Sequence, residues 1–167
     1  MELLAPAGSR QALTAAVQSG ADAVYLGGPQ FGARYSAENF TIEEMKTWVD
    51  YCHLYGVDVH VTVNTLVKEK EIESLKEYLK QLNEIGVDAL IVQDMGAVEI
   101  IKKTVPDMTL HASTQMTVTS LEGVKYLEDM GFSRVVLARE LSEKEIEHIC
   151  KNAKAEIEVF VHGAICM

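Results

Sequence analysis

The stretch YGVDVHVTVN, residues 55–64, decides the fold class because it joins a helix-ending glycine to an alternating strand. Gly56 follows a helical pattern, and a helix C-terminus favours a glycine in the left-handed conformation. One face of the strand is apolar and consists of Val57, Val59, Val61 and Val63. The other face is polar and consists of Asp58, His60, Thr62 and Asn64. Strands covered by helices on both faces are nearly continuously apolar, so this alternation favours a sheet with one inward polar face.

The same glycine-then-strand plan recurs at residues 19–28, 85–94 and 130–139. It predicts helix ends at Gly20, Gly86 and Gly131. The strands predicted over the whole chain are 2–5, 23–27, 58–64, 89–94, 109–114, 134–139 and 156–162. Six helices, some of them short, separate these seven strands. Strict alternation predicts a parallel sheet with right-handed crossovers.

Several helices have recognisable starts in the sequence. TIEE at 41–44 and SEKE at 142–145 are capping boxes, in which a Ser or Thr caps the helix and a Glu reaches back. TSLE at 119–122 is expected to repeat the device, with Thr119 as the cap.

Two closures of the sheet compete, an open doubly wound sheet and a (β/α)8 barrel. The first strand is not followed by a Gly-x-Gly-x-x-Gly turn, which weakens the dinucleotide-binding doubly wound option. Polar inward faces favour the barrel, although a solvent-exposed antiparallel face is a further alternative. A barrel of this class takes about 250 residues. We therefore predict an α/β, TIM-type barrel truncated after about seven strands, with residues 1–167 as a single incomplete domain.

Composition limits the location and the partners of the chain. No apolar run reaches the roughly 20 residues of a membrane-spanning helix, and the start of the chain does not resemble a secretory signal. We therefore expect a cytoplasmic protein without a membrane partner. Three widely spaced cysteines do not make a disulfide framework. The net charge of −10 counts against binding of a nucleic-acid backbone by these residues.

In a barrel, the site lies at the C-terminal ends of the strands. The residues at those ends are Asn64, Asp94, Ser113, Gln115, Arg139, Glu140 and His162. Four of them also have a structural explanation: Asn64 and Asp94 could cap helices, and Arg139 could pair with Glu140 at the surface. The sequence has no Gly-x-Ser-x-Gly elbow, no His-Glu-x-x-His pair and no phosphate-binding Gly-Lys-Ser/Thr loop.

A series of motifs spans residues 2–166 and carries a resemblance to a known family. The motifs are ELLAPAG, GADAVYLGG, FGAR, NFT, VTVNTL, GVDALIVQD, LHASTQ, RVVLARELS and EVFVHGAIC. Together they resemble the N-terminal part of the U32 peptidase family, the collagenase-like proteases. The resemblance implies a (β/α)8-type barrel, with C-terminal domains in longer members that are absent from this sequence. It also implies oxygen-independent hydroxylation of tRNA uridine or ribosomal RNA cytidine, or a related role in anaerobic ubiquinone synthesis.

The resemblance also singles out residues. The candidate catalytic residues are His111, Gln115, Arg139, Glu140, Glu158 and His162, and Ser113 is a candidate substrate-binding residue. Asn64 and Asp94, which come from the strand ends and not from the resemblance, are the other candidate substrate-binding residues. We expect Arg139 with Glu140 to orient a polar substrate group, and His111 with His162 to carry protons. Glu158 would be the partner of these histidines or have a raised pKa.

Cys166 matches the first of four cysteines that hold an iron–sulfur cluster (4Fe-4S) in several full-length relatives. A lone thiolate cannot hold such a cluster, so we expect none bound in this chain and no activity from this chain alone.

Three functions remain open from the sequence. The first is an RNA-hydroxylation enzyme in truncated form, with tRNA or rRNA as the partner. The second is a collagenase-like peptidase, a hydrolase acting on a peptide, in which Cys166 and His162 form a thiolate–imidazole pair. The third is a non-catalytic assembly barrel. Exposed barrel edges would allow self-association into a homo-oligomer.

Overall fold

The structure is a computed structural model that describes residues 1–33 and 40–162. It divides into two compact units, Met1–Met108 and Thr109–Met167. The expectation of a single domain over the whole chain stays a prediction, and each unit is described by itself.

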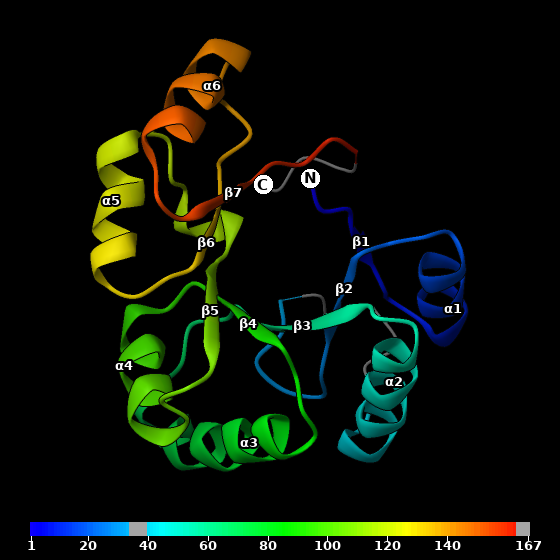
Figure 1. The fold of residues 1–167 in the computed structure, drawn as a ribbon. Helices are drawn as coiled ribbons and strands as arrows, with labels where there is room; N and C mark the ends of the chain where they lie inside the picture. Colours follow the sequence, from blue (N-terminus) through cyan, green and yellow to red (C-terminus); the bar gives the residue numbers. More distant parts are fainter. Residues whose placement is uncertain (34–39, 163–167) are drawn as a thin grey trace. The chain divides into compact units, whose positions relative to one another are not determined.

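The N-terminal unit alternates strands and helices in chain order (Figure 1). Its elements are β1 (Leu4–Pro6), α1 (Arg10–Gln18), β2 (Ala23–Gly27), α2 (Ile42–Leu54), β3 (Asp58–Val63), the 3-10 helix η1 (Glu69–Glu71), α3 (Ile72–Glu84), β4 (Ala89–Val92) and α4 (Met95–Thr104). These four strands form three parallel pairs, β1 with β2, β2 with β3 and β3 with β4. The helices lie outside the strands, as the predicted right-handed crossovers require.

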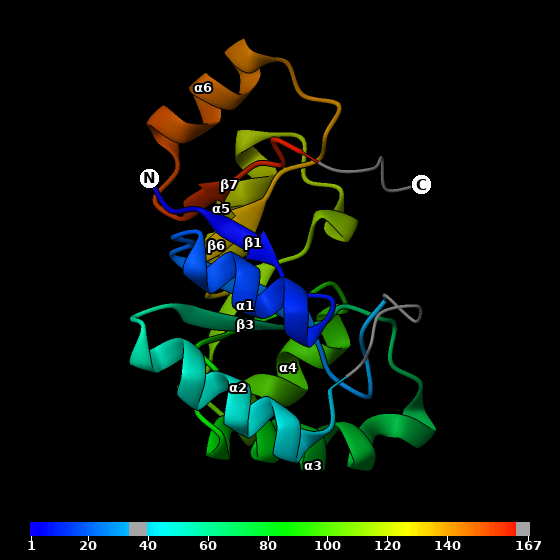
Figure 2. The same ribbon diagram turned by 90° about the vertical axis from the view of Figure 1, so that its right-hand side faces the viewer.

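The C-terminal unit continues the alternation. Its elements are β5 (Thr109–Ala112), the 3-10 helix η2 (Thr114–Met116), α5 (Leu121–Asp129), β6 (Arg134–Val136), α6 (Glu143–Asn152) and β7 (Glu156–Glu158). β5 pairs in parallel with β6, and β6 pairs in parallel with β7. Helix α6 contacts both α5 and β7 (Figure 2).

The predicted helix ends and two of the three predicted helix starts are confirmed. Gly20, Gly56, Gly86 and Gly131 have φ of 86°, 69°, 82° and 82°, the left-handed conformation that glycine adopts without strain. Capping boxes form at Thr41 and Ser142. The third prediction was wrong by one residue: Ser120, not Thr119, caps α5, and its hydroxyl accepts a hydrogen bond from the backbone N–H of Gly123.

The apolar face of β3 is buried, and so is His60 on its polar face. Val59, Val61 and Val63 are fully buried, as expected for the face toward the helices. His60, on the polar face, is also only 3% exposed. The polar face is therefore shielded from solvent at His60, and β3 pairs in parallel with both of its neighbours. Together these observations exclude the alternative of an exposed antiparallel face.

The strands of the C-terminal unit end earlier than predicted. β5 ends at Ala112, β6 at Val136 and β7 at Glu158. Ser113 leaves the strand because its hydroxyl accepts a hydrogen bond from the backbone N–H of Gln115 and so starts η2. Most candidate site residues after these strands therefore lie on loops, where binding residues are commonly found.

The longest helices of the described residues, α2 and α3, have 13 residues each. A helix that crosses a bilayer needs about 20 apolar residues. In the part of the chain that the structure describes, no helix is long and apolar enough to do so.

A carboxylate ties the start of β7 to helix α5 and makes stability depend on pH. Glu128 Oε1 accepts hydrogen bonds from the backbone N–H groups of Lys154, at 2.6 Å, and Ala155, at 2.9 Å. The bond from Ala155 is the largest cause that lowers the pKa of Glu128. A lowered folded-state pKa means that the charged form stabilises the fold above the unfolded-state pKa of about 4.3. This stabilisation is lost as the pH falls through the lowered folded-state pKa.

We therefore expect Glu128→Gln to lower the denaturation midpoint at neutral pH. The difference from the wild type should shrink as the pH falls from the unfolded-state pKa of about 4.3 through the lowered folded-state pKa, because the wild-type carboxylate takes up a proton over this range. Urea denaturation at a series of pH values from neutral downward measures this. Glu122→Gln is the control, because the Glu122 carboxylate pairs with the exposed Lys125 in the described part of the chain. A midpoint difference that stays constant with pH would contradict this role of Glu128.

Candidate functional site

A cavity of about 300 Å³ lies in the C-terminal unit where β6 and β7 end. The loop after β6 contributes Arg139 and Leu141, and helix α6 contributes Ile146. The segment after β7 contributes Phe160, Val161 and His162. The carboxyl ends of parallel strands are where barrel folds place their sites, so the cavity has the position predicted for one.

Arg139 and Phe160 form the polar and aromatic centre of this cavity. The guanidinium carbon of Arg139 lies 4.1 Å from the centroid of the Phe160 ring, the geometry of a cation–π contact. The Arg139 Nε is buried and has no hydrogen-bond partner among the described residues. The expected alternative, a surface ion pair between Arg139 and Glu140, does not form within the described part of the chain. Arg139 therefore presents a cation that lies on an aromatic ring and whose Nε–H has no partner among residues 1–33 and 40–162.

His162 lines the same cavity as Arg139, so the structure brings these two predicted residues together. Glu140 follows Arg139 but is exposed and does not line the cavity. Cys166 lies outside the described residues, as does its predicted pairing with His162. Phe160 was not among the predicted site residues, although its position two residues after Glu158 and two before His162 placed it on their face.

Ser113 and Gln115 lie together at the start of η2. The Ser113 hydroxyl donates to Gln115 Oε1 at 3.4 Å and accepts from the Gln115 backbone N–H at 3.3 Å. Ser113 is buried, whereas Gln115 is exposed. Part of the hydrogen-bonding capacity of Ser113 is therefore used to turn the chain after β5.

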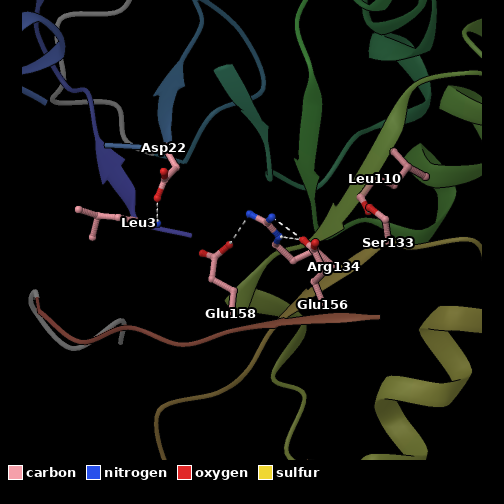
Figure 3. A network of polar contacts seen from close by, with 7 residues as sticks. All are labelled: Leu3, Asp22, Leu110, Ser133, Arg134, Glu156 and Glu158. Atoms are coloured by element: carbon pink, nitrogen blue, oxygen red, sulfur yellow. Dashed lines mark hydrogen bonds and ion pairs between the residues drawn. The ribbon is translucent and has the colours of Figure 1, made fainter. Parts of the chain in front are cut away.

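His111 lies within β5 and Glu158 lies within β7, on either side of the buried Arg134 of β6. Arg134, the first residue of β6, pairs in register with His111 on β5 and with Glu156 on β7. Its Nε and Nη2 donate to Glu156 Oε2 at 2.8 and 2.5 Å, and its Nη1 lies 3.7 Å from Glu158 Oε2 (Figure 3). The Arg134 side chain is only 9% exposed. The position of Glu158 beside this cation gives it a structural ion pair, in addition to any catalytic role.

Asn64 and Asp94 lie at the strand ends of the N-terminal unit and hold loops there. Asn64 Oδ1 accepts from the backbone N–H of Ala33 at 3.0 Å. Asp94 Oδ1 caps helix α4 through the backbone N–H of Ala97, and Asp94 Oδ2 accepts from Val67 N–H, both at 3.0 Å. Asp94 therefore caps the next helix, the alternative to substrate binding that was predicted for both residues, whereas Asn64 holds the loop at Ala33 and does not cap a helix.

The described cysteines do not supply a cluster site. Cys52 is buried, and desolvation, with a smaller contribution from Asp88, raises its pKa to about 11, which disfavours the thiolate that binds metal. Cys150 is exposed on α6. No group of three or more potential metal ligands occurs among residues 1–33 and 40–162. The described residues therefore do not fit an iron–sulfur cluster, and we derive no step through one.

A second cavity, of about 430 Å³, lies between the start of α5 and helix α6. It is lined by side chains of both signs, including Glu122, Lys144 and Glu145. Glu122 pairs with Lys125, and Glu145 is used by the capping box of α6. This cavity lies between helices and not at strand ends, so we do not assign the site to it.

Comparisons with known proteins identify the class of this fold. The chain superimposes on the solved structure named the U32 peptidase Mk0906 with a TM-score of 0.77, covering 95% of this chain and 68% of that one, at 20% identity. This likeness confirms the predicted fold class, an α/β barrel of the (β/α)8 type. The model of Peptidase family U32 matches residues 8–167, and the chain belongs to this family.

Two curated relatives match essentially the whole chain. The 23S rRNA 5-hydroxycytidine C2501 synthase of Escherichia coli is 44% identical over 100% of this chain. The tRNA hydroxylation protein P1 of Bacillus subtilis is 40% identical over 99% of this chain. The chain spans 25% and 39% of the lengths of these two relatives.

Proposed function

We propose that this chain is the β/α part of an enzyme that hydroxylates a pyrimidine base of ribosomal or transfer RNA. The observation that carries the proposal is the sequence identity, 44% and 40%, that the chain shares over essentially its whole length with two relatives named for such hydroxylation. The cavity at the ends of β6 and β7 supports it, because it offers a cation and an aromatic ring at the position of a barrel site. We place the reaction in the cytoplasm, where these RNAs are found.

The reaction replaces a hydrogen on the pyrimidine ring by a hydroxyl group. This removes two electrons from the base, so it needs an oxygen donor and an electron acceptor. The described residues contribute binding and proton handling: Arg139 would hold a base oxygen, and His162 would carry a proton at the mouth of the cavity. A cluster that Cys166 would hold together with cysteines of a longer protein stays part of the proposal, and no step of the reaction is derived through it.

The negative charge of the chain limits how it can hold RNA. A net charge of −10 repels the phosphate backbone, so non-specific affinity from these residues should be low. Recognition by this chain must therefore depend on the base itself, and backbone contacts would come from other residues of a longer protein. The peptidase alternative rests on the family name and on the His162–Cys166 pair, which lies partly outside the described residues.

Deletion of the encoding gene tests the proposal. We expect nucleosides digested from the tRNA and rRNA of the deletion strain to lack one hydroxylated pyrimidine that the parent strain contains. Liquid chromatography with mass spectrometry measures this loss, and the wild-type gene on a plasmid should restore the nucleoside. An unchanged nucleoside profile in cells grown both with and without oxygen would contradict the proposal.

A further inference from the structure

We infer that the cavity at the ends of β6 and β7 is a pocket for a single unstacked pyrimidine base, which packs against the Arg139–Phe160 pair. This inference rests on the proposed function and specifies which residues of the site read the base. Neither the family match nor the names of the relatives assigns any residue of this cavity to RNA.

The lining favours a flat, partly apolar ligand over a phosphate group. Leu141, Ile146 and Val161 form walls of the cavity, and Arg139 is its one arginine or lysine. Val161 is 88% exposed, so a ligand at the mouth would cover an apolar side chain that the fold leaves in water. A volume of about 300 Å³ lies at the lower end of the range for small-molecule pockets, which suits one ring and not an extended peptide.

Arg139 and Phe160 together provide the two interactions that select a base. Aromatic rings and guanidinium planes are the surfaces on which proteins stack the unpaired bases of RNA. The Arg139 Nε–H is buried without a partner among the described residues, so a base acceptor entering the cavity could satisfy it. A guanidinium presents its donors as a planar fork, which matches the adjacent O2 and N3 acceptors of a cytosine or a carbonyl oxygen of a uracil.

An enzyme that modifies a base must also expose that base. Enzymes that act on a ring atom take the base out of the stack or use a single-stranded region. A pocket on the loops after β6 and β7 is accessible to such an extruded base. The surroundings of Arg134 are not, because its side chain lies within β6 and is only 9% exposed.

The test is binding of single-stranded oligoribonucleotides to the intact protein made from its natural gene. Fluorescence anisotropy compares an oligonucleotide that carries one central pyrimidine with the same oligonucleotide abasic at that position. We expect Phe160→Leu and Arg139→Gln each to weaken binding of the pyrimidine oligonucleotide about tenfold, the lower part of the range for loss of one base–aromatic stack. The wild-type protein should bind the abasic oligonucleotide as weakly as the two variants bind the pyrimidine oligonucleotide. The two substitutions should not weaken binding of the abasic oligonucleotide further.

Matched controls in the same unit separate this effect from general changes. Tyr126→Leu removes an exposed aromatic ring from α5, and Lys144→Gln removes one positive charge from α6. Both variants should bind like the wild type. An oligonucleotide with 4-thiouridine at the central position should also form a photo-crosslink to the peptide containing Phe160.

Each outcome has a distinct meaning. If the abasic oligonucleotide binds as tightly as the pyrimidine oligonucleotide, the protein recognises only phosphate and the inference is overturned. The inference is also overturned if Phe160→Leu and Arg139→Gln bind the pyrimidine oligonucleotide as tightly as the control variants do. If the deletion strain lacks the hydroxylated nucleoside while these variants bind normally, the base pocket is wrong and the proposed function stands. If the pocket binds the base while the deletion strain keeps its nucleosides, the proposed function fails instead.

Discussion

Replacing Gly28 by alanine is expected to destabilise the N-terminal unit by about 3 kcal/mol, the upper part of the range for overpacking a well-packed core. Gly28 follows β2, and an ideal Cβ at this position would lie 1.8 Å from the Tyr78 hydroxyl oxygen and 3.3 Å from Met45 Sδ. Tyr78 lies on α3 and is 2% exposed, so its ring cannot move aside into solvent. The methyl group would therefore push β2 and α3 apart.

The Tyr78 hydroxyl is the atom that makes this substitution costly, so Tyr78→Phe should reverse part of the loss. The hydroxyl is buried without a hydrogen-bond partner among the described residues, and this burial raises the pKa of Tyr78. Tyr78→Phe alone should therefore be close to neutral. Urea denaturation of the wild type, both single variants and the double variant gives the coupling energy. A Gly28→Ala variant as stable as the wild type, or a double variant no better than Gly28→Ala, would show that the contact is not the cause.

The second large effect is expected from Arg134→Ala in the C-terminal unit. Removing the guanidinium takes a cation away from the half-buried Glu158 and deletes packing at a buried position. Breaking a buried ion pair from one side costs about 3–5 kcal/mol. Because Glu156, the other partner, is 67% exposed, we expect the lower end of this range, about 3 kcal/mol.

Arg10→Ala is the matched control for Arg134→Ala. Arg10 also pairs with a glutamate, Glu44, but its side chain is 61% exposed. Exposed ion pairs contribute about 0–1 kcal/mol, so Arg10→Ala should have a much smaller effect on the free energy of unfolding. Similar losses in the two variants would contradict the burial argument for Arg134.

The order of strands and helices could be predicted because it depends on local signals. Gly20, Gly56, Gly86 and Gly131 end helices through their own backbone conformation, and Thr41 and Ser142 start helices through residues three positions away. Such interactions span a few residues, so they are visible in one sequence. The cap at Ser120 shows the limit, because two adjacent hydroxyl residues compete and the structure selects the second.

The site could be predicted only in part because it depends on contacts between distant segments. Arg139 and His162 were predicted from the rule that strand ends carry the site, and they line one cavity. Phe160 was missed because its importance depends on the Arg139 guanidinium above its ring. The network around Arg134 was missed because it requires the register that places β6 beside β7. Asn64 and Asp94 accept hydrogen bonds from the backbones of Ala33 and Val67, which are contacts between distant segments that one sequence does not show.

The central claim is that the pocket at the ends of β6 and β7 serves the hydroxylation of an RNA base. The most direct measurement is nucleoside mass spectrometry of the deletion strain complemented with Phe160→Leu or, as the control, with Tyr126→Leu. We expect Tyr126→Leu to restore the hydroxylated pyrimidine and Phe160→Leu to restore little of it at equal protein level. Full restoration by Phe160→Leu would contradict this account.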